Sequence, residues 1–337
     1  MTMRFQSFGQ RGVSLIELMV AMAIGIFLML GAVTVFNQSR NTHRASEAVA
    51  RLQETARLAM DVVETDIRMA NYWGMSNKPE YIVNRAAAGQ SPPAEFTTQQ
   101  QTNVSLCGAA GSNFMIDLEQ YIGGSNDAYG LQCGASNYQA GTDVVVIRRA
   151  NEAQPAALDP NRVYLQTSRI QGTLFVPAGG CTDPTNAACI PPAYLPPASQ
   201  SRELEMHAYY VSSQSTLRND LPSLRRKRFA SVNAAMATNA VIDEEIAPGV
   251  EDMQVRLGID TNDDTNIDQY VSPGAVPANA RVVSATIWMR IRAEERDFGF
   301  IDDTAYQYAG MAAAFTPNDN YRRILISKTV HIRNTRV

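Results

Sequence analysis

An acidic run in the C-terminal part of the chain has the clearest potential for chemistry. Its oxygen-bearing side chains stand at alternate positions and once more four residues later, at Asp260, Asn262, Asp264 and Asp268. Oxygen ligands with this spacing are typical of a calcium loop. The match is incomplete, because Thr265 stands where such loops carry glycine and Val271 where they end in glutamate. The sequence therefore predicts either a calcium site or a solvated Asn/Asp turn in a hairpin. Apart from this candidate calcium ion, we expect the protein to require no cofactor.

No set of residues has the spacing of a catalytic site. The three histidines, His43, His207 and His331, are far apart in the sequence and define neither a metal site nor a triad. Fingerprints such as GxSxG, HExxH, the P-loop and the dinucleotide-binding motif are absent from the sequence. Trp73 and Trp288 are expected in the core or at an interface. We therefore expect a protein that is not an enzyme.

A basic run, Arg225-Arg226-Lys227-Arg228, is the one feature that suggests nucleic acid. Phe229 alone gives it little aromatic interleaving, and the chain as a whole carries a net charge of −4. A solvated strand or turn explains such a charge run more simply. Nucleic acid is therefore not an expected partner.

Four cysteines, Cys107, Cys133, Cys181 and Cys189, leave three disulfide pairings open. The sequential pairing closes the shortest loops. A zinc site is the rival interpretation, but the sequence has no CxxC pair and no nearby histidine to support it. Disulfides indicate an oxidising compartment.

The N-terminus contains an apolar run with one charge inside it. Residues Val13 to Phe36 carry only Glu17, and a helix of this length reaches about 36 Å, enough to span a bilayer. A secretory signal peptide would have a shorter apolar region and a small-residue cleavage site after it. A plain signal anchor would not explain the carboxylate, since a charge at the centre of a membrane helix costs about 2.5–3.5 kcal/mol. Glu17 is therefore expected to be functional.

The segment from Gly12 to Val20, GVSLIELMV, resembles the class III signal of type IV pilins and pseudopilins. The resemblance implies that a prepilin peptidase cuts after Gly12 and that the new N-terminus, Val13, is methylated. It also implies that Glu17 pairs with the N-terminal amine of a neighbouring subunit. Such a pairing is physically reasonable because a buried carboxylate is tolerated beside a cation. Val13 is a mild departure, since Phe or Met is commoner at that position.

The apolar run continues as an amphipathic helix. Its apolar stripe consists of Val49, Leu52, Ala56, Met60, Val63 and Ile67. Its polar face is expected to hold Arg51, Glu54, Arg57, Asp61, Glu64 and Arg68. Gly74 is a plausible stop. We therefore divide the chain into a leader (1–12), a transmembrane half-helix (13–36), an amphipathic half-helix (37–74) and a globular β-rich domain with disulfide-containing loops (75–337).

The remainder of the chain indicates β-structure with large loops. Residues 75 to about 140, which include SPPAEFTTQQQTNVS, and the proline-rich segment PAGGCTDPTNAACIPPAYLPP read as loops. We place a partner-facing surface in the second of these. The expected strands are 141–150, 162–168, 171–176, 204–211, 224–229, 250–259, 267–271, 281–292 and 321–333. In the segment 282–291, apolar side chains alternate with others, which indicates an antiparallel sheet covered on one face by the helix stripe.

The C-terminal half also resembles the PilW family of minor pilins. The resemblance rests on the order of MHAYYVS, LPSLRRKRF, VEDMQVRLGIDTNDDTNIDQYV and YRRILISKTVHIRN. It implies an α+β type IV pilin-like fold, in which a long helix packs on an antiparallel sheet with large loop insertions. It also implies a role in a complex of minor pilins that primes pilus assembly and sits at the tip of a filament used in adhesion and twitching motility.

The resemblance further implies partners and a location. The partners are other minor pilins, the major pilin, the prepilin peptidase, the inner-membrane assembly platform and a tip adhesin. The chain would cross the inner membrane once, with its C-terminal domain in the periplasm, before it enters the extracellular pilus. Two alternatives stay open. One is a J-type pseudopilin of type II secretion, and the other is a membrane-tethered calcium-dependent adhesin or hydrolase.

Overall fold

A computed structural model describes residues 12–85, 93, 95–108, 113–192, 198–233 and 240–335. Residues 1–11 of the predicted leader lie outside the described part of the chain. The chain forms two compact units, Met1–Ala50 and Arg51–Val337.

The first unit consists of the N-terminal part of helix α1, which runs from Leu15 to Met69. The large apolar side chains from Val13 to Phe36 are all at least half exposed. An 18-residue window of this helix has a mean hydropathy of 2.5, and none of that window is buried. Among the described residues α1 is the one helix that is long and apolar enough to cross a membrane. An exposed apolar surface of this kind is typical of a helix that contacts lipid or other helices.

In the second unit, α1 presents the predicted apolar stripe to the core, but the prediction is wrong for Val49, which belongs to the first unit and is 39% exposed. Its buried members are Leu52, Ala56, Met60, Val63 and Ile67. The helix ends at Met69 rather than near Gly74, because Asn71 takes a left-handed backbone with φ of 60°. One prediction for the polar face is wrong: Glu64 is 6% exposed, since it bonds to Arg68 and to Lys328.

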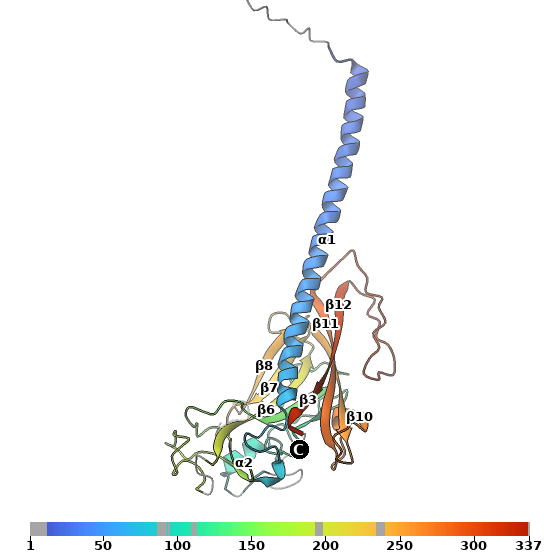
Figure 1. The fold of residues 1–337 in the computed structure, drawn as a ribbon. Coiled ribbons are helices and arrows are strands. Elements are labelled where there is room, and N and C mark those ends of the chain that lie inside the picture. Colours follow the sequence, from blue (N-terminus) through green and yellow to red (C-terminus); the bar gives the residue numbers. More distant parts are fainter. Residues whose placement is uncertain are drawn as a thin grey trace, which may run out of the picture. The chain divides into compact units, whose positions relative to one another are not determined.

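Two sheets form the body of the second unit (Figure 1). The larger has eight strands in the order β1-β5-β4-β6-β3-β2, with β7 beside β6 and β8 beside β7. These strands are β1 (Ile82–Val83), β2 (Ile122–Ser125), β3 (Val144–Ala150), β4 (Tyr164–Thr167), β5 (Gly172–Phe175), β6 (Gln200–Ser212), β7 (Ser223–Phe229) and β8 (Val241–Pro248). All their pairings are antiparallel apart from β1 with β5.

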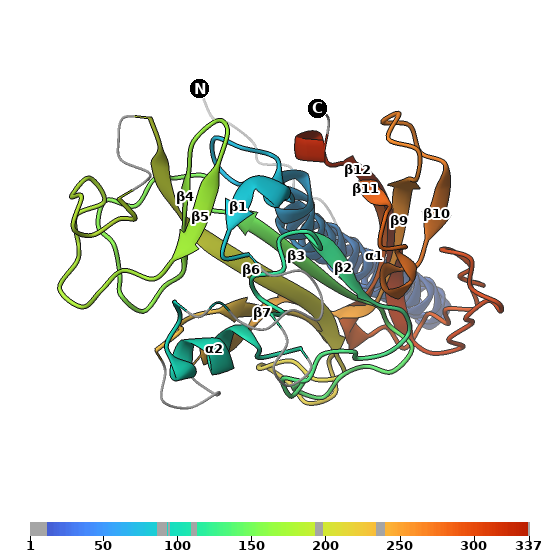
Figure 2. The same ribbon diagram turned by 90° about the horizontal axis from the view of Figure 1, so that it is seen from below.

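The smaller sheet has four antiparallel strands in the order β10-β9-β11-β12. These are β9 (Val250–Asp260), β10 (Gln269–Val271), β11 (Arg281–Arg296) and β12 (Tyr321–His331). The remaining elements are α2 (Thr98–Val104) and the 3-10 turns Pro79–Tyr81, Pro273–Ala275 and Arg333–Thr335. From below, the helix is seen between β3 and β6 of one sheet and β9, β11 and β12 of the other (Figure 2). A single core cluster joins side chains of α1 with those of both sheets.

The fold is α+β and pilin-like, as predicted, but it differs from the sequence prediction in several respects. There are two sheets rather than one. Strand β8 was not predicted, and α2 lies in a segment predicted as loop. Helix α2 forms because Thr97 and Gln100 bond reciprocally as a capping box. Strands β1 and β2 also lie in the region predicted as loop, and β10 is shorter than expected, because Asp268 belongs to the preceding turn.

Residues 297–320, which we call the β11–β12 strap, cover the outer face of the smaller sheet. The strap is anchored to three strands in turn. Asp302 pairs with Arg323 of β12 at 3.2 Å, the Phe315 ring lies 3.9 Å from the guanidinium of Arg290 on β11, and Tyr308 donates to Asp252 of β9. The face of β11 opposite the helix is therefore covered as well.

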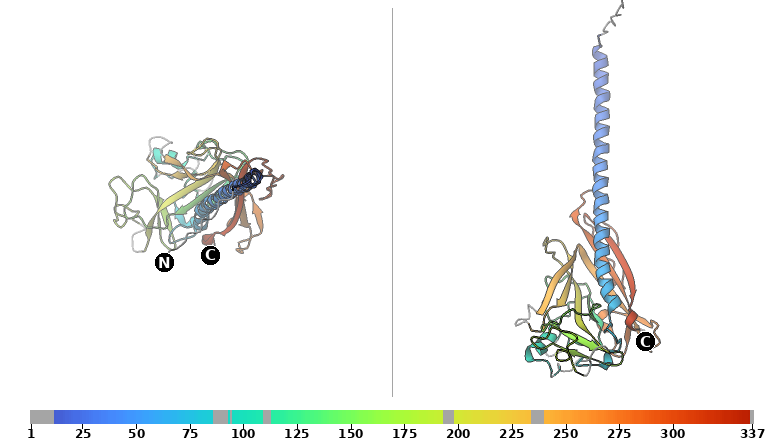
Figure 3. Two further views of the ribbon diagram at one scale, coloured as in Figure 1. Left: turned by 90° about the horizontal axis from the view of Figure 1, so that it is seen from above. Right: turned by 60° about the vertical axis from the view of Figure 1, so that its left-hand side comes forward.

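The chain passes from the larger sheet to the smaller one at Gly249, between β8 and β9. Gly249 has a φ of +85°, its amide donates to Pro222, and its carbonyl accepts from Arg292. A Cβ at this position would lie 2.7 Å from the Arg292 carbonyl oxygen. Only glycine fits this corner without strain. The right-hand view in Figure 3 shows the strands of the unit from a second side.

The corner gives a first prediction. Gly249→Ala should lower the free energy of unfolding by roughly 2–3 kcal/mol, of which about 1–2 kcal/mol comes from the left-handed backbone and the rest from the clash. The measurement is urea unfolding of the full chain in detergent micelles, followed through the fluorescence of the fully buried Trp73.

Gly141→Ala is the matched control, because Gly141 has a φ of +80° but a Cβ added there would meet no atom within 4 Å. Gly141→Ala should lower the free energy of unfolding only by the part that comes from the left-handed backbone, about 1–2 kcal/mol. Equal losses for the two variants would show that the sheet corner is not tightly packed.

Candidate functional site

The residues predicted to take part in processing and assembly lie at the start of α1. Gly12, Val13 and Ser14 are exposed and precede the helix, and a Cβ at Gly12 would meet nothing within 4 Å. The backbone amide and the hydroxyl of Ser14 donate to Glu17 Oε2 at 2.9 and 3.0 Å. The Glu17 amide donates back to Ser14 Oγ at 3.3 Å. This reciprocal pair is a capping box, the S-x-x-E signature of a helix N-terminus.

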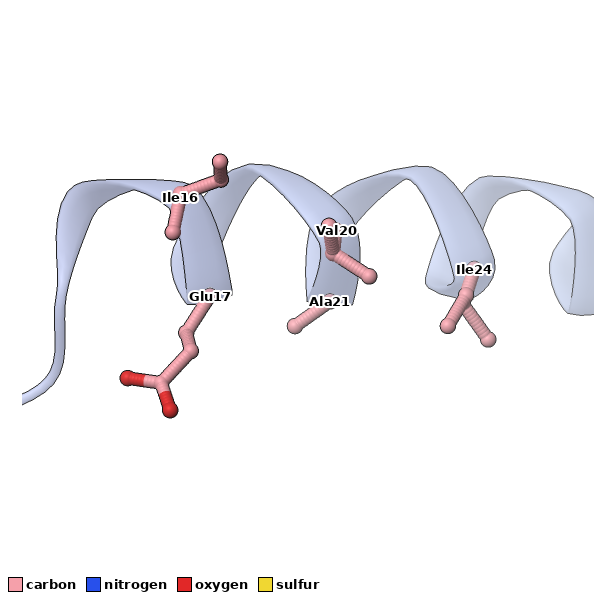
Figure 4. Close-up of a pocket in the computed structure, with 5 residues that line it drawn as sticks. All are labelled: Ile16, Glu17, Val20, Ala21 and Ile24. Atoms are coloured by element: carbon pink, nitrogen blue, oxygen red, sulfur yellow. The ribbon is translucent and has the colours of Figure 1, made fainter.

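Glu17 also lines a shallow, open apolar groove. The other lining residues are Ile16, Val20, Ala21 and Ile24. Figure 4 shows the carboxylate projecting away from the helix axis. Within the described part of the chain, the hydrogen bonds of Glu17 all go to Ser14. If this face enters lipid or a filament core, no ion pair among the described residues compensates the negative charge of Glu17.

An uncompensated carboxylate in an apolar medium is costly, and a cation from outside relieves that cost. The capping box satisfies part of the hydrogen-bonding capacity of the Glu17 carboxylate but does not neutralise its charge. The free amine of a second subunit would supply both a hydrogen-bond donor and a positive charge. The geometry therefore leaves room for the predicted pairing and shows a local role for Glu17 that was missed. The signal was present in the sequence, as serine three residues before glutamate at the start of an apolar run.

A second set of polar residues holds α1 in the second unit. Asp66 is 3% exposed and projects from α1 toward the larger sheet. His207 Nδ1 lies 2.6 Å from Asp66 Oδ2, and Arg149 Nε donates to Asp66 Oδ1 at 3.0 Å. The hydroxyl of Tyr209 also donates to Asp66. Three donors from β3 and β6 thus converge on one carboxylate of the helix, an arrangement that we call the Asp66 clamp.

The clamp decides the charge state of Asp66. Burial acts to raise its pKa, but the bond and charge of His207, the charge of Arg149 and the Tyr209 hydroxyl outweigh burial and lower the pKa to about 2. Asp66 is therefore ionised at neutral pH. On the other side of the helix, Glu64 bonds to Lys328 of β12. The helix is fixed by charge to both sheets.

The acidic run forms the turn between β9 and β10. Its oxygens are engaged by the turn's own backbone: Asp260 accepts from the amides of Asp263 and Thr265, at 2.7 Å each. Asp268 accepts from Thr261 at 2.8 Å. Thr265 has a φ of 68°, the conformation that glycine takes in calcium loops.

No group of three or more His, Cys, Asp or Glu side chains in the described ranges is arranged to hold a metal. The calcium site at Asp260, Asn262, Asp264 and Asp268 therefore stays a prediction. Calorimetric titration tests it, since binding would release or absorb heat and raise the melting temperature, and Asp268→Asn would remove both effects.

The basic run lies on β7 and faces acidic residues of β8. Arg225 and Lys227 pair with Asp243 at 2.9 and 3.0 Å, and Arg226 pairs with Glu244 at 2.6 Å. This cross-strand neutralisation explains how so charged a sequence forms two sheet strands. It also means that most of this positive charge is already compensated within the domain.

The remaining candidate residues are structural in their placement. Cys107 is bonded to Cys133 and Cys181 to Cys189, which is the sequential pairing. Trp73 is fully buried, and Trp288 is partly exposed on β11. Of the histidines, His207 belongs to the Asp66 clamp, and His43 lies 3.8 Å from Glu47 on the exposed helix.

Comparisons with known proteins match both ends of the chain. Residues 7–33 match the prokaryotic N-terminal methylation motif, and residues 208–334 match the family described as type IV pilus-assembly protein W. The chain is similar to the pilin-like protein PilA3 of Thermus thermophilus, with 34% identity over 86 residues. That alignment covers 25% of this chain and 35% of the relative, so the chain spans about a third of the relative's length. No solved structure matches the chain.

The apolar N-terminal helix, its methylation motif and the sheets that the helix covers define a type IV pilin-like protein. Within this class, the C-terminal match covers the end of β6 and all of β7 to β12. The family described as type IV pilus-assembly protein W is thus matched by the C-terminal 38% of the chain, residues 208–334.

The Asp66 clamp gives a second prediction. Asp66→Asn should lower the free energy of unfolding by about 3 kcal/mol at pH 7, because it removes one partner of a buried charge pair. Asp61→Asn, on the exposed face beside Arg57, should cost less than about 1 kcal/mol. Urea unfolding of the full chain in micelles measures both.

The clamp also predicts a pH dependence. The folded pKa of Asp66 lies below its unfolded value of 3.8, so its contribution is complete above that value and is lost as pH falls toward 2. The native chain should lose about 2 kcal/mol more than Asp66→Asn between pH 5 and pH 2. Identical acid sensitivity in the two chains would contradict this assignment.

Proposed function

We propose that this chain is a minor pilin that takes part in type IV pilus assembly, in a priming complex with other minor pilins at the pilus tip. The observation that carries the proposal is Glu17, a carboxylate on an exposed apolar helix five residues after Gly12. The match of residues 208–334 to the family of type IV pilus-assembly protein W supports it.

In this account the precursor crosses the inner membrane once through residues 13–36, with the second unit in the periplasm. The prepilin peptidase cuts after Gly12, and Val13 becomes a methylated N-terminus. Glu17 then exchanges its bonds with Ser14 for the amine of a neighbouring subunit, which is a stronger, charge-assisted bond. The subunit thereby acquires its register next to other minor pilins and the major pilin, and it leaves the membrane through the assembly platform.

A J-type pseudopilin of type II secretion would use the same physical parts, so the genes beside this one would distinguish the two. A tip adhesin is a further proposed partner. The exposed, disulfide-closed loop from Cys181 to Cys189 offers a surface for it.

The capping box makes a sharp test of the role of Glu17 possible. Glu17→Gln keeps an oxygen that accepts from Ser14 but removes the charge. Glu17→Ala removes both. If the charge is what guides assembly, both variants should be cleaved normally, yet enter pili at least about tenfold less than the native chain, since losing one partner of a desolvated charge pair costs about 2 kcal/mol or more.

The measurement is the amount of each variant in sheared pili relative to its amount in membranes. Glu47→Gln, later on the same helix, is the matched control and should assemble normally. Gly12→Ala should accumulate as uncut precursor. Normal incorporation of Glu17→Gln together with failure of Glu17→Ala would assign Glu17 to the helix cap alone.

A further inference from the structure

The β11–β12 strap begins with a turn that presents two large apolar side chains to solvent. Phe298 is 84% exposed and Ile301 is 63% exposed, although both belong to an ordered turn. Leu217, which is 71% exposed, lies on a nearby turn whose Arg218 donates to the Glu294 carbonyl at 3.0 Å. Aromatic and aliphatic side chains held in the open are typical of residues that enter a partner's surface.

The turn is fixed by its polar neighbours. The Phe300 amide donates to the Asp297 carbonyl at 2.9 Å, and the Asp297 amide donates to Asn320 at 2.7 Å. Arg322 of β12 donates to the Asp297 carboxylate at 2.9 Å and stacks 4.3 Å from the ring of Phe300. Phe300 is thus held against the sheet while Phe298 and Ile301 remain outside. A partner would meet a preorganised surface, which lowers the cost of binding.

The position of the turn follows from the direction of β12. Lys328 bonds to Glu64 of α1, and Asn334 Nδ2 donates to the Ala70 carbonyl at 3.1 Å. Strand β12 therefore runs in the same direction as α1, and the turn before Tyr321 lies toward the Arg51 end of the helix. Figure 1 shows the strap at the same end of the smaller sheet.

Exposed acidic residues outnumber exposed basic ones beside the turn. Glu294, Glu295 and Asp303 are exposed there, against one exposed arginine of the same segment, Arg296. This negative rim opposes contact with anionic lipid head groups. It favours an apolar surface that carries positive charge.

The exposed part of α1 that follows the apolar run has this complementary character. Phe36, Arg40, Arg44 and Arg51 lie within about 80° of one another on a helical wheel, at 100° per residue. All four are exposed, and the guanidinium of Arg40 lies 5.9 Å from the Phe36 ring. Glu47 shares this face but lies beside His43. The face therefore combines an aromatic ring with an excess of positive charge.

We infer that the Phe298–Ile301 turn of one subunit docks on the basic, apolar face that follows the membrane span of a neighbouring pilin-type subunit. The inference rests on the proposed function, because assembly places such helices side by side. Phe298 and Ile301 contact the apolar part of the neighbouring helix, and the acidic rim faces its arginines. This side-chain contact further restricts the register between neighbouring subunits that Glu17 sets.

The test is photo-crosslinking in cells that assemble the filament, with a photoreactive phenylalanine derivative in place of Phe298 in the full chain. The expected adduct migrates above the processed monomer. By mass spectrometry it should join position 298 to the helix that follows the apolar span of a chain carrying the N-terminal methylation motif. The same group at Ile170, which is 76% exposed on another turn, is the matched control and should give no such adduct.

Reversal of the rim charge tests the electrostatic part. The double change Glu294→Lys and Glu295→Lys should lower the yield of the adduct at least about threefold without changing folding, because both side chains are exposed. An adduct only with lipid, only within one chain, or only with other surfaces would overturn the inference, as would no adduct from chains that are processed and incorporated. If the chain is not processed or not incorporated at all, the proposed function fails, and the inference that rests on it fails as well.

Discussion

The second unit depends on a charge buried inside it. Asp66 lies on the core side of α1, and it stays ionised there because Arg149, His207 and Tyr209 all point at it. A buried pair of this kind adds less net stability than its close contacts suggest, because both charges lose water. Its value is specificity: an apolar stripe alone would allow the helix to slide or rotate, whereas one carboxylate among three donors permits a single register. Lys328 and Glu64 fix the other side of the helix in the same way.

The same helix has to work in a second environment. From Val13 to Phe36 its surface is exposed and apolar, and there the one carboxylate, Glu17, bonds only to Ser14 within the described chain. Asp66 and Glu17 are therefore contrasting solutions to one problem. The first carboxylate has its partners in its own domain, so it stabilises the subunit. In our account the second finds its cation in another subunit, so it stabilises an assembly.

The local features of the fold could be predicted from the sequence, and the long-range ones could not. The stripe from Leu52 to Ile67 and the β-branched strands appear in short windows, because helix and strand periodicity is local. Strand β8 was missed because Asp243 and Glu244 make its sequence polar, and they become favourable only opposite the arginines of β7. The role of Asp66 was hidden for the same reason, since His207 is 141 residues away. The helix α2 and the Ser14–Glu17 cap, by contrast, had capping-box signatures that the sequence does contain.

The central claim is that the apolar helix begins, after processing, at Val13. Mass spectrometry of the N-terminal peptide of the membrane-bound protein, from cells with and without a prepilin peptidase, tests this most directly. The account predicts a peptide that starts at Val13, carries a methyl group on its amine, and is found only when the peptidase is present. An N-terminus at Met1 in both strains, or a cut near Asn37, would contradict it. Residues 13–36 would then be an anchor or a signal peptide, and Glu17 would have no neighbouring amine to meet.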